Sequence, residues 1–267
     1  VTIISRTSSL NCRTFEYAVA VKSLKIPEGI EDGGADAQDS FIREAAITAQ
    51  FDHPGIVGLI GVVTHGDPCL MVLQLCEKGA LDSLVKKEEI PTEQLLTWSA
   101  EVCAGMAYLS SRSFVHRDLA ARNVLVGANP TDVKLADLGA ARSVFRLADR
   151  EYSASTVHKP ARWMAPESLK HATFTNKTDM WAFGVLCWEV TSLGKTPYGA
   201  LDIKDMMEGL EHGDRLQEAP FTPPGLYKVL KLCWSLNPKR RPNFSDLVHN
   251  LGEIRGALAV TADGRMT

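Results

Sequence analysis

Five charged or amide side chains fall close together near the middle of the 267-residue chain: His116, Arg117, Asp118, Arg122 and Asn123. An apolar pair precedes this stretch, and an apolar run rich in valine follows it. A buried strand rarely carries so many charged groups, and a solvated turn does not need apolar flanks. The pattern therefore predicts a short loop, fixed at both ends, that holds polar groups over a cleft.

Three of the polar groups in this region have a characteristic spacing. Asn123 follows Asp118 by five residues, and Asp137 begins an Asp-Leu-Gly sequence shortly afterwards. This arrangement resembles that of enzymes that transfer phosphoryl groups, a reaction that needs mainly positioning and charge neutralisation, with a carboxylate to receive the acceptor's proton and oxygen ligands for a metal ion. A charged surface turn is the alternative for the tripeptide at 116–118 alone, but it leaves Asn123 and Asp137 unexplained.

The whole stretch resembles the protein kinase catalytic loop, H-R-D-L-x-x-x-N, and its Ala-Ala-Arg resembles the tyrosine-specific branch of that family. The resemblance implies that Asp118 is the catalytic base and that Asn123 and Asp137 bind magnesium. It also implies that Arg122 lies near the incoming phenol and positions Asp118. Serine/threonine kinases instead carry a Lys two residues after the Asp, where this chain has Ala120.

A buried strand ending in a cation is predicted from Ala18 to Lys22. It is similar to the V-A-I-K of kinases, whose lysine binds the α- and β-phosphates of ATP. Glu44 lies in a segment of helical spacing, capped by Asp39 or Ser40, which resembles kinase helix αC and its lysine-binding glutamate. Considered singly, Lys22 and Glu44 would each be interpreted as an exposed surface charge. The acidic, glycine-containing residues 28–38 between them predict a solvated loop.

Two more strands are predicted, from His53 to Val63 and from Cys69 to Leu75. In a kinase the second strand would end at a gatekeeper residue, here Leu73. The hinge that follows, Gln74 to Cys76, would meet adenine through its backbone. Cys76 in the hinge is either a reactive thiol at the cleft or, as we favour, a buried inert cysteine. The resemblance implies an ATP-binding set of Val1, Ala20, Lys22, Leu73, Gln74, Leu75, Cys76, Gly79 and Leu125.

The first eighteen residues contain no glycine. A kinase is expected to place G-x-G-x-x-G over the ATP phosphates. Because Val1 suits the valine that ends this motif, we expect the chain to begin just after it. Absence of the loop from the protein is the alternative.

Two substitutions reduce the apolar packing expected beneath helix αC. Leu138 stands where kinases usually have the Phe of D-F-G, and Thr48 stands where many relatives carry a larger apolar residue. Together they predict a looser coupling between the helix and Asp137, without loss of activity.

Residues 140–164 correspond to the activation loop, and Tyr152 is the tyrosine in it. A phosphate there would add about −1.5 to −2 charge. Arg117 and Arg142 are expected to pair with that phosphate and order the loop. An ordinary exposed tyrosine is the alternative, and we favour regulation.

The segment at 160–167 is similar to the tyrosine kinase substrate-binding segment, and its R-W-M-A-P-E form mildly favours receptor tyrosine kinases. Near the end of the fold, C-W-x-x-x-P-x-x-R-P-x-F matches another family motif, so Arg241 is expected to form a buried ion pair with Glu167. The resemblance gives structural or regulatory roles to His116, Arg117, Leu138, Glu167, Asp179 and Arg241.

Two helices are predicted to form the core of the second half. Apolar residues recur at helical spacing from Thr92 to Ser110, and a helix that is apolar on nearly all sides is expected from Thr178 to Val190. Asp179 is expected to cap the second helix and, by resemblance, to hold the backbone of the catalytic loop. Beyond Gly256 we expect the chain to fray.

Bulk properties exclude several classes of protein. A formal charge of −3 and a pI near 6.2 give no electrostatic basis for binding nucleic acid or a membrane surface. Six widely spaced cysteines argue against a zinc site or a disulfide framework and favour a reducing, cytoplasmic compartment. The longest nearly apolar run, at 180–190, is shorter than the roughly 20 residues that span a bilayer. An anchor elsewhere in a longer parent, as in a single-pass receptor, stays open.

The resemblance implies an α+β, bilobal protein kinase fold. A small β-rich N-lobe with helix αC would occupy residues 1–73, the hinge 74–79, and a larger, mainly helical C-lobe 80–267. The implied activity is that of a protein tyrosine kinase using ATP and Mg²⁺, with tyrosine-presenting proteins and ATP-site inhibitors as partners and no predicted oligomeric state. A pseudokinase scaffold is the alternative, which the five polar residues Lys22, Glu44, Asp118, Asn123 and Asp137 disfavour.

Overall fold

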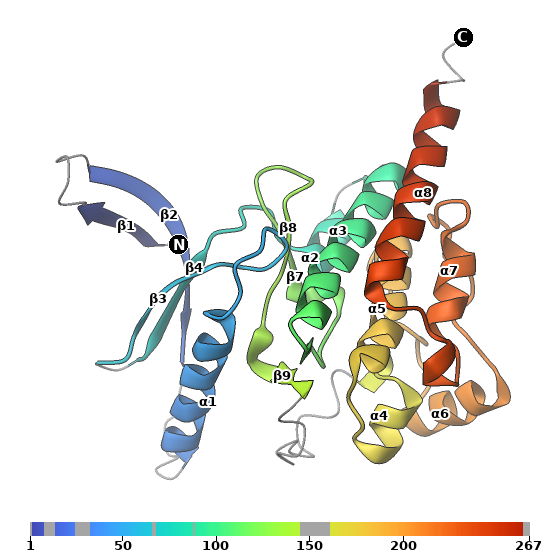
Figure 1. Ribbon diagram of the computed structural model, residues 1–267, viewed down its shortest axis with the longest axis horizontal. Coiled ribbons are helices and arrows are strands. Elements are labelled where there is room, and N and C mark those ends of the chain that lie inside the picture. Colours follow the sequence, from blue (N-terminus) through green and yellow to red (C-terminus); the bar gives the residue numbers. More distant parts are fainter. Residues whose placement is uncertain are drawn as a thin grey trace.

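The computed structural model describes residues 2–7, 14–24, 33–65, 68–87, 89–144 and 161–263. Two residues with an expected role, Val1 and Tyr152, lie outside this part of the chain. Figure 1 shows a strand-rich part at the N-terminal end and a larger, mainly helical part that continues to the C-terminus. This arrangement confirms the α+β fold class expected from the sequence.

The N-terminal part is an antiparallel sheet of four strands in the order β1-β2-β4-β3, with helix α1 (Gly33–Thr48) beside it (Figure 1). Phe41 and Ala45 of the helix form a small core with Cys69 and Met71 of the sheet side. Burial of these apolar side chains fixes α1 against the sheet. The strands are β1 (Thr2–Thr7), β2 (Thr14–Ser23), β3 (Leu59–Val63) and β4 (Leu70–Gln74).

The C-terminal part is built on helices, and short strands connect it to the polar loop. Helix α8 packs along α3, and α5 lies between α3 and α7 in the core. The helices are α2 (Leu81–Lys87), α3 (Thr92–Ser111), α4 (Pro166–His171), α5 (Asn176–Thr191), α6 (Ile203–His212), α7 (Leu226–Cys233) and α8 (Phe244–Asp263). The short strands are β5 (Gly79–Ala80), β6 (Phe114–Val115), β7 (Val124–Val126), β8 (Val133–Leu135) and β9 (Arg142–Ser143).

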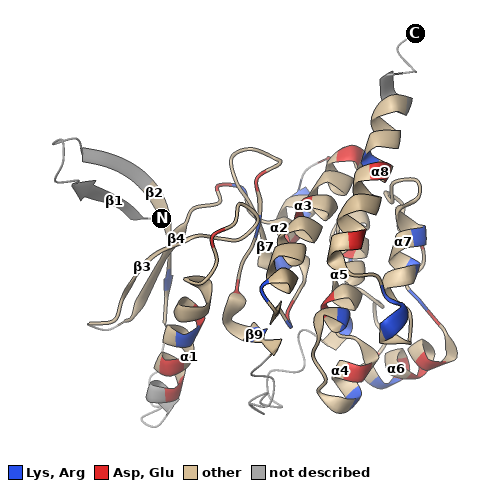
Figure 2. Ribbon diagram, in the orientation of Figure 1, with Lys and Arg blue, Asp and Glu red and all other residues tan. Residues whose placement is uncertain are grey.

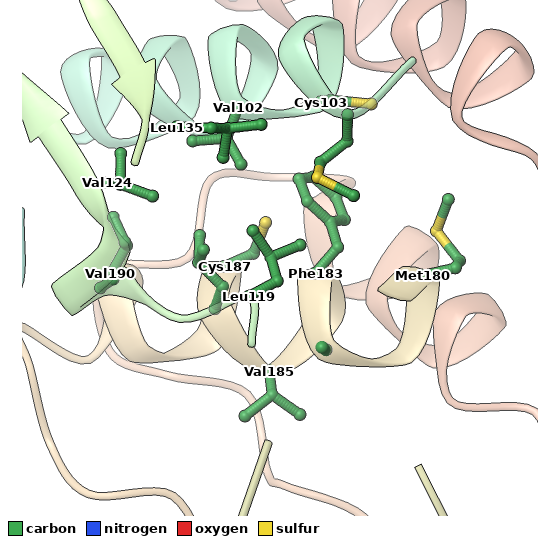
Figure 3. Packing of buried hydrophobic residues seen from close by; sticks show 14 of the residues in the cluster. Val102, Cys103, Leu119, Val124, Leu135, Met180, Phe183, Val185, Cys187 and Val190 are labelled. Atoms are coloured by element: carbon green, nitrogen blue, oxygen red, sulfur yellow. The ribbon is translucent and has the colours of Figure 1, made fainter. Parts of the chain in front are cut away.

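Helix α5 is the centre of the main core, and nearly every residue along it is buried, as its apolar sequence predicts. Figure 3 shows Phe183 and Cys187 of α5 facing Val102 and Cys103 of α3, with Leu119 from the polar loop among them. Leu119 is 1% exposed. The polar loop is therefore attached to the core through one of its own side chains.

The sequence-based boundaries were wrong at two helices. Helix α1 begins at Gly33, so part of the expected loop at 28–38 is helical and neither Asp39 nor Ser40 is a cap. Asp36 lies in its first turn, where a carboxylate is favoured by the helix dipole. Helix α8 continues to Asp263 instead of fraying after Gly256, and Leu258 packs against the main core.

Two other local expectations also differ from the structure. The strand expected from His53 begins only at Leu59, because Pro54 and Gly55 form a turn. Thr175, not Asp179, is the N-cap of α5, and it forms a capping box with Thr178.

Positively and negatively charged residues are interspersed along the helices of the described chain (Figure 2). The distribution agrees with the formal charge of −3 for the whole sequence. The fold is therefore held mainly by its apolar core, and the charged groups discussed below are local arrangements within it.

Candidate active site

The polar loop predicted at 116–123 is anchored from below by helix α5. The buried carboxylate of Asp179 accepts hydrogen bonds from the backbone N–H of His116 at 2.7 Å and of Arg117 at 3.0 Å. Burial raises the pKa of Asp179, although His116 and the two backbone donors oppose that rise. Arg117 has a φ of +72°, a left-handed conformation that non-glycine residues rarely adopt. Asp179 thus holds the backbone of the loop, as the resemblance implied, and the loop contains a strained residue.

Asp118, the expected base, has both carboxylate oxygens engaged. Asn123 donates its side-chain N–H to Oδ2 of Asp118 at 2.8 Å and to the Asp118 backbone carbonyl at 2.7 Å. The guanidinium of Arg122 donates to the other oxygen, Oδ1. The backbone N–H of Asp118 donates to Nδ1 of His116 at 3.3 Å. The carboxylate is therefore fixed in direction by neighbours from its own loop.

The β7–β8 hairpin brings the two expected metal ligands to the same place. Val124 pairs with Leu135 in the antiparallel register. The backbone N–H of Ala136 donates to the carbonyl of Asn123 at 2.9 Å. Asn123 just before β7 and Asp137 just after β8 consequently lie at the same end of the hairpin. Asp137 adopts a left-handed conformation, with φ 56° and ψ 60°, and its side chain is 50% exposed.

Lys22 joins the strand-rich part to this region. Its Nζ lies 2.7 and 2.8 Å from the two carboxylate oxygens of Glu44 on α1 and 3.3 Å from Oδ1 of Asp137. Burial lowers the pKa of Lys22, but Asp137 and Glu44 outweigh it, and the pKa is raised above the usual value of 10.5. Lys22 is therefore a cation throughout the neutral pH range. Because Lys22, Glu44 and Asp137 lie far apart in sequence, their contacts are the strongest evidence that the fold brings these residues into one site.

Gly139 and Leu138 fit closely under helix α1. The side chain of Leu138 is 1% exposed, and a Cβ atom on Gly139 would come within 3.2 Å of Oε2 of Glu44. Thr48 is also buried, and its hydroxyl donates to the carbonyl of Glu44 at 2.9 Å. Because the hydroxyl is engaged within the helix, the methyl group is the part of the Thr48 side chain that is available for apolar packing. The predicted looser coupling of α1 to Asp137 stays a prediction.

The residues expected to meet adenine lie on adjoining strands and on the chain that leaves them. Ala20 of β2 is opposite Leu73 of β4 in the sheet register. Cys76 is 7% exposed, and burial raises the pKa of its thiol to about 11, so it is an unreactive thiol at neutral pH. Gly79 has a φ of +76° and begins β5, which pairs Ala80 with Leu125. The expected set also includes Gln74, which is exposed, and Leu75, which is half-buried.

Comparison with known sequences identifies the family. The family described as protein tyrosine and serine/threonine kinase matches residues 4–251. The chain belongs to this family.

Three relatives of this kinase chain are similar to it over most of its length and are themselves much longer. Human ephrin type-A receptor 1 is 38% identical over 251 residues, which are 93% of this chain and 25% of the receptor. Ephrin type-A receptor 7 of Gallus gallus is 37% identical over 242 residues, 90% of this chain and 24% of the receptor. Tyrosine-protein kinase Abl of Drosophila melanogaster is 40% identical over 253 residues, 93% of this chain and 15% of that kinase. The chain spans a quarter or less of the length of each of the three.

The expected ion pair of the kinase chain is formed by Arg241 and Glu167. Two guanidinium nitrogens donate to the two carboxylate oxygens at 2.6 and 3.0 Å. Arg241 also donates to the carbonyls of Ser235 at 2.9 Å and Lys177 at 2.8 Å, and its guanidinium lies 5.0 Å from the centre of the Trp181 ring. The arginine side chain is 0% exposed. It therefore connects the segment after the activation loop to the helices of the C-terminal part.

Two arginines were expected to receive a phosphate on Tyr152. Arg142 donates to the carbonyls of Gly139 at 2.9 Å and Ala141 at 2.8 Å. The guanidinium of Arg117 lies 4.9 Å from the centre of the Phe174 ring. Since Tyr152 is outside the described residues, their pairing with its phosphate stays a prediction.

Glu189 was not among the residues predicted from sequence, and Trp163 was predicted only as part of the segment at 160–167. Glu189 on α5 is 6% exposed, and Trp163 donates its indole N–H to Oε2 of Glu189 at 2.9 Å. Burial raises the pKa of Glu189, and the N–H donors of Ala121 and Trp163 oppose the rise. The available signal was an acidic residue within the apolar run of α5, well beyond the first turn that holds Asp179, because such a residue is rarely buried without partners.

Within the described residues, no helix is long and apolar enough to pass through a membrane. The same part of the chain holds no group of three or more His, Cys, Asp or Glu side chains arranged to bind a metal ion. A kinase metal site does not require such a group, because substrate phosphates supply part of the coordination. The carboxylate of Asp137 and the amide oxygen of Asn123 are the hard oxygen donors that suit Mg²⁺.

Proposed function

We propose that this chain is the catalytic domain of a protein tyrosine kinase, which transfers the γ-phosphoryl group of ATP to tyrosine hydroxyls of protein substrates. The N-lobe would comprise residues 1–73, the hinge 74–79 and the C-lobe 80–267. The observation that carries the proposal is the contact of Lys22 with both Glu44 and Asp137. A purely structural ion pair would not need a third charge from a left-handed residue of another part of the fold.

Each polar residue has a defined task in this proposal. Asp118 receives the proton of the acceptor hydroxyl and directs its oxygen toward the γ-phosphorus. Arg122 and Asn123 keep the carboxylate of Asp118 in that direction. Lys22, held by Glu44, binds phosphate oxygens and neutralises their charge.

Mg²⁺ is the metal that the donor set supports, with Asn123 and Asp137 as its protein ligands. When bound, it supplies neutralisation of the charge on the phosphate oxygens. Ala20, Leu73, Leu125 and the hinge would surround the adenine ring. The same surfaces would accept ATP-site inhibitors.

The choice of tyrosine as acceptor is tested with a matched pair of peptides. Because Ala120 and Arg122 replace the lysine arrangement of serine/threonine kinases, we expect a tyrosine peptide to have a kcat/KM at least about tenfold above that of the serine version. Such a ratio corresponds to about 1.4 kcal/mol of transition-state discrimination. The measurement is transfer of radiolabelled phosphate from ATP by the full-length protein. A serine peptide phosphorylated better than the tyrosine peptide would contradict the acceptor assignment.

Phosphorylation at Tyr152 is proposed to activate the enzyme. Tyr152→Phe removes the acceptor hydroxyl, so we expect the lag before full activity to lengthen when dephosphorylated enzyme is incubated with ATP and Mg²⁺. Progress curves of peptide phosphorylation, with and without prior autophosphorylation, measure the lag. If prior autophosphorylation changes the rate of neither wild type nor the variant, Tyr152 is not the switch.

The parent protein is proposed to be a receptor with this domain on its cytoplasmic side. The R-W-M-A-P-E sequence at 162–167 and the two relatives named as ephrin receptors support this proposal. Tyrosine-protein kinase Abl, whose name does not describe a receptor, is similar to the chain at a comparable identity. The identities therefore support a non-receptor kinase equally well. The sequence of the whole parent protein decides between the two.

A further inference from the structure

Glu189 links three separate elements around one carboxylate oxygen. It lies in α5, and its Oε2 accepts the backbone N–H of Ala121 at 3.0 Å and the indole N–H of Trp163 at 2.9 Å. Ala121 begins the short 3₁₀ helix of the catalytic loop, and Trp163 ends another that precedes α4. A carboxylate that is 6% exposed and accepts two N–H donors fixes both of them.

Both hydrogen bonds lead to Asp118. Ala121 is three residues after Asp118, in the turn that also positions Asn123. The guanidinium of Arg122 lies 5.0 Å from the centre of the Trp163 ring, a distance typical of a cation–π contact, and it donates to Asp118. Fixing the indole therefore fixes the face on which Arg122 rests.

Trp163 also belongs to the acceptor side of the site. It lines a small cavity of about 10 Å³ between the catalytic loop and α5, together with Asp118 and Met164. This volume holds about one water molecule, so the cavity marks where Trp163 packs against the loop and is not a site for a tyrosine side chain. The resemblance of the segment at 160–167 to the substrate-binding segment of tyrosine kinases implies that the acceptor binds beside Trp163. Glu189 thus contacts both this segment and the loop that carries Asp118.

We propose that Glu189 is a positioning residue that holds Trp163 and the catalytic loop in register, so that the acceptor tyrosine meets Asp118 in a reactive orientation. This proposal rests on the proposed function, because it concerns the acceptor half of the same site. Glu189 makes its side-chain hydrogen bonds to Ala121 and Trp163. The contacts of Lys22 with Glu44 and Asp137 involve other residues, so ATP binding should depend on Glu189 less than peptide binding does. A misplacement of about 1 Å in such a site can cost about 10²-fold in rate.

Glu189→Met removes the oxygen that accepts both N–H groups while keeping a side chain of similar length. We expect the KM for a tyrosine peptide to rise about fivefold and kcat to fall about tenfold, with the KM for ATP within about twofold of wild type. Glu189→Gln keeps one oxygen that can accept both N–H groups, so it should restore most of the loss. Glu218→Met replaces an exposed glutamate elsewhere in the C-terminal part and is the matched control.

Trp163→Phe tests the same link without changing Glu189. It removes the indole N–H and keeps an aromatic ring beneath Arg122, so it should raise the peptide KM by a smaller factor than Glu189→Met. In the Trp163→Phe background, Glu189→Met should have less effect than in wild type, because one of its two contacts is already lost. This variant decides the question even if Glu189→Met does not fold.

A solely structural role predicts a different set of results. Glu189→Met would then lower the thermal midpoint and reduce kcat in proportion to the folded fraction, with an unchanged peptide KM, and this result would overturn the proposal. Fluorescence anisotropy of a labelled tyrosine peptide, without ATP, gives an independent dissociation constant. If wild type binds the peptide but transfers no phosphate, the proposed function fails. The ratio of dissociation constants between Glu189→Met and wild type still decides the role of Glu189. If wild type does neither, both proposals fail.

Discussion

Replacing Asp118 with asparagine is expected to reduce phosphate transfer to a tyrosine acceptor by about 10²–10⁴-fold, the usual contribution of a positioned general base. Asparagine has nearly the same shape, but its amide cannot take up the proton of the acceptor hydroxyl. One of its two terminal groups would also be an N–H₂ facing the donors of Arg122 and Asn123, which now engage both oxygens of the carboxylate. The change therefore removes both the base and the arrangement that directs it.

The loss should appear in kcat and leave the KM for ATP nearly unchanged. Lys22, Glu44 and Asp137 contact one another and not Asp118, so most of the phosphate-binding side is left intact. Asn123 would lose its contact with the carboxylate but would keep its hydrogen bond to the backbone carbonyl of Asp118. The measurement is radiolabelled phosphate incorporated from ATP into poly(Glu,Tyr) by the full-length protein. Asp205→Asn, at an exposed position of α6, is the matched control and should behave as wild type. Equal incorporation by wild type and Asp118→Asn would reject catalysis through Asp118 and favour the pseudokinase scaffold.

The residues of the candidate active site could be selected from sequence because they lie in local patterns with fixed spacings. Lys22 ends an apolar strand, Glu44 lies in a helical segment, and Asp118 and Asn123 share one loop. None of these residues alone distinguishes a functional site from a surface charge. The resemblance to the kinase family predicted that Lys22 pairs with Glu44. In the structure these two side chains are in contact at 2.7 Å.

Glu189 could not be predicted because its partners are defined only by the tertiary fold. Ala121 is 68 residues away in sequence, and it contributes a backbone N–H that has no side-chain signature. A similar reason explains the error at Asp179. A carboxylate in the first turn of a helix resembles a cap, but here Thr175 caps the helix and Asp179 is free to hold the catalytic loop.

The predicted end of the last helix was wrong because a packed helix can extend beyond its packed part. Residues beyond Gly256 are small and polar enough to suggest fraying, yet α8 packs along α3, with Leu258 against the main core, and is helical to Asp263. Val260 is 72% exposed, so the last turns gain little burial; they extend a helix that is already formed and need no new nucleation. Local patterns therefore located the elements but not their ends.

The second large effect is expected for stability, at the buried pair of Arg241 and Glu167. Arg241→Met should lower the free energy of unfolding by about 3–5 kcal/mol, because it leaves a largely buried carboxylate without its cation. Glu167 is only 19% exposed, and the carbonyls of Ser235 and Lys177 would also lose their donor. Against a typical total of about 5–15 kcal/mol, this is a large fraction.

Urea denaturation followed by circular dichroism measures the change, with Arg240→Met as the control. Arg240 is the exposed neighbour, so its replacement should change the unfolding free energy by less than about 0.5 kcal/mol. Combining Arg241→Met with Glu167→Leu should recover part of the loss, because an apolar pair needs no compensating charge whereas a single buried ion does. If Arg241→Met and Arg240→Met have the same midpoint and slope, the ion pair does not stabilise the fold. If the double variant is less stable than Arg241→Met by the full effect of Glu167→Leu alone, the two residues act independently, and the 2.6 Å contact contributes no coupling energy.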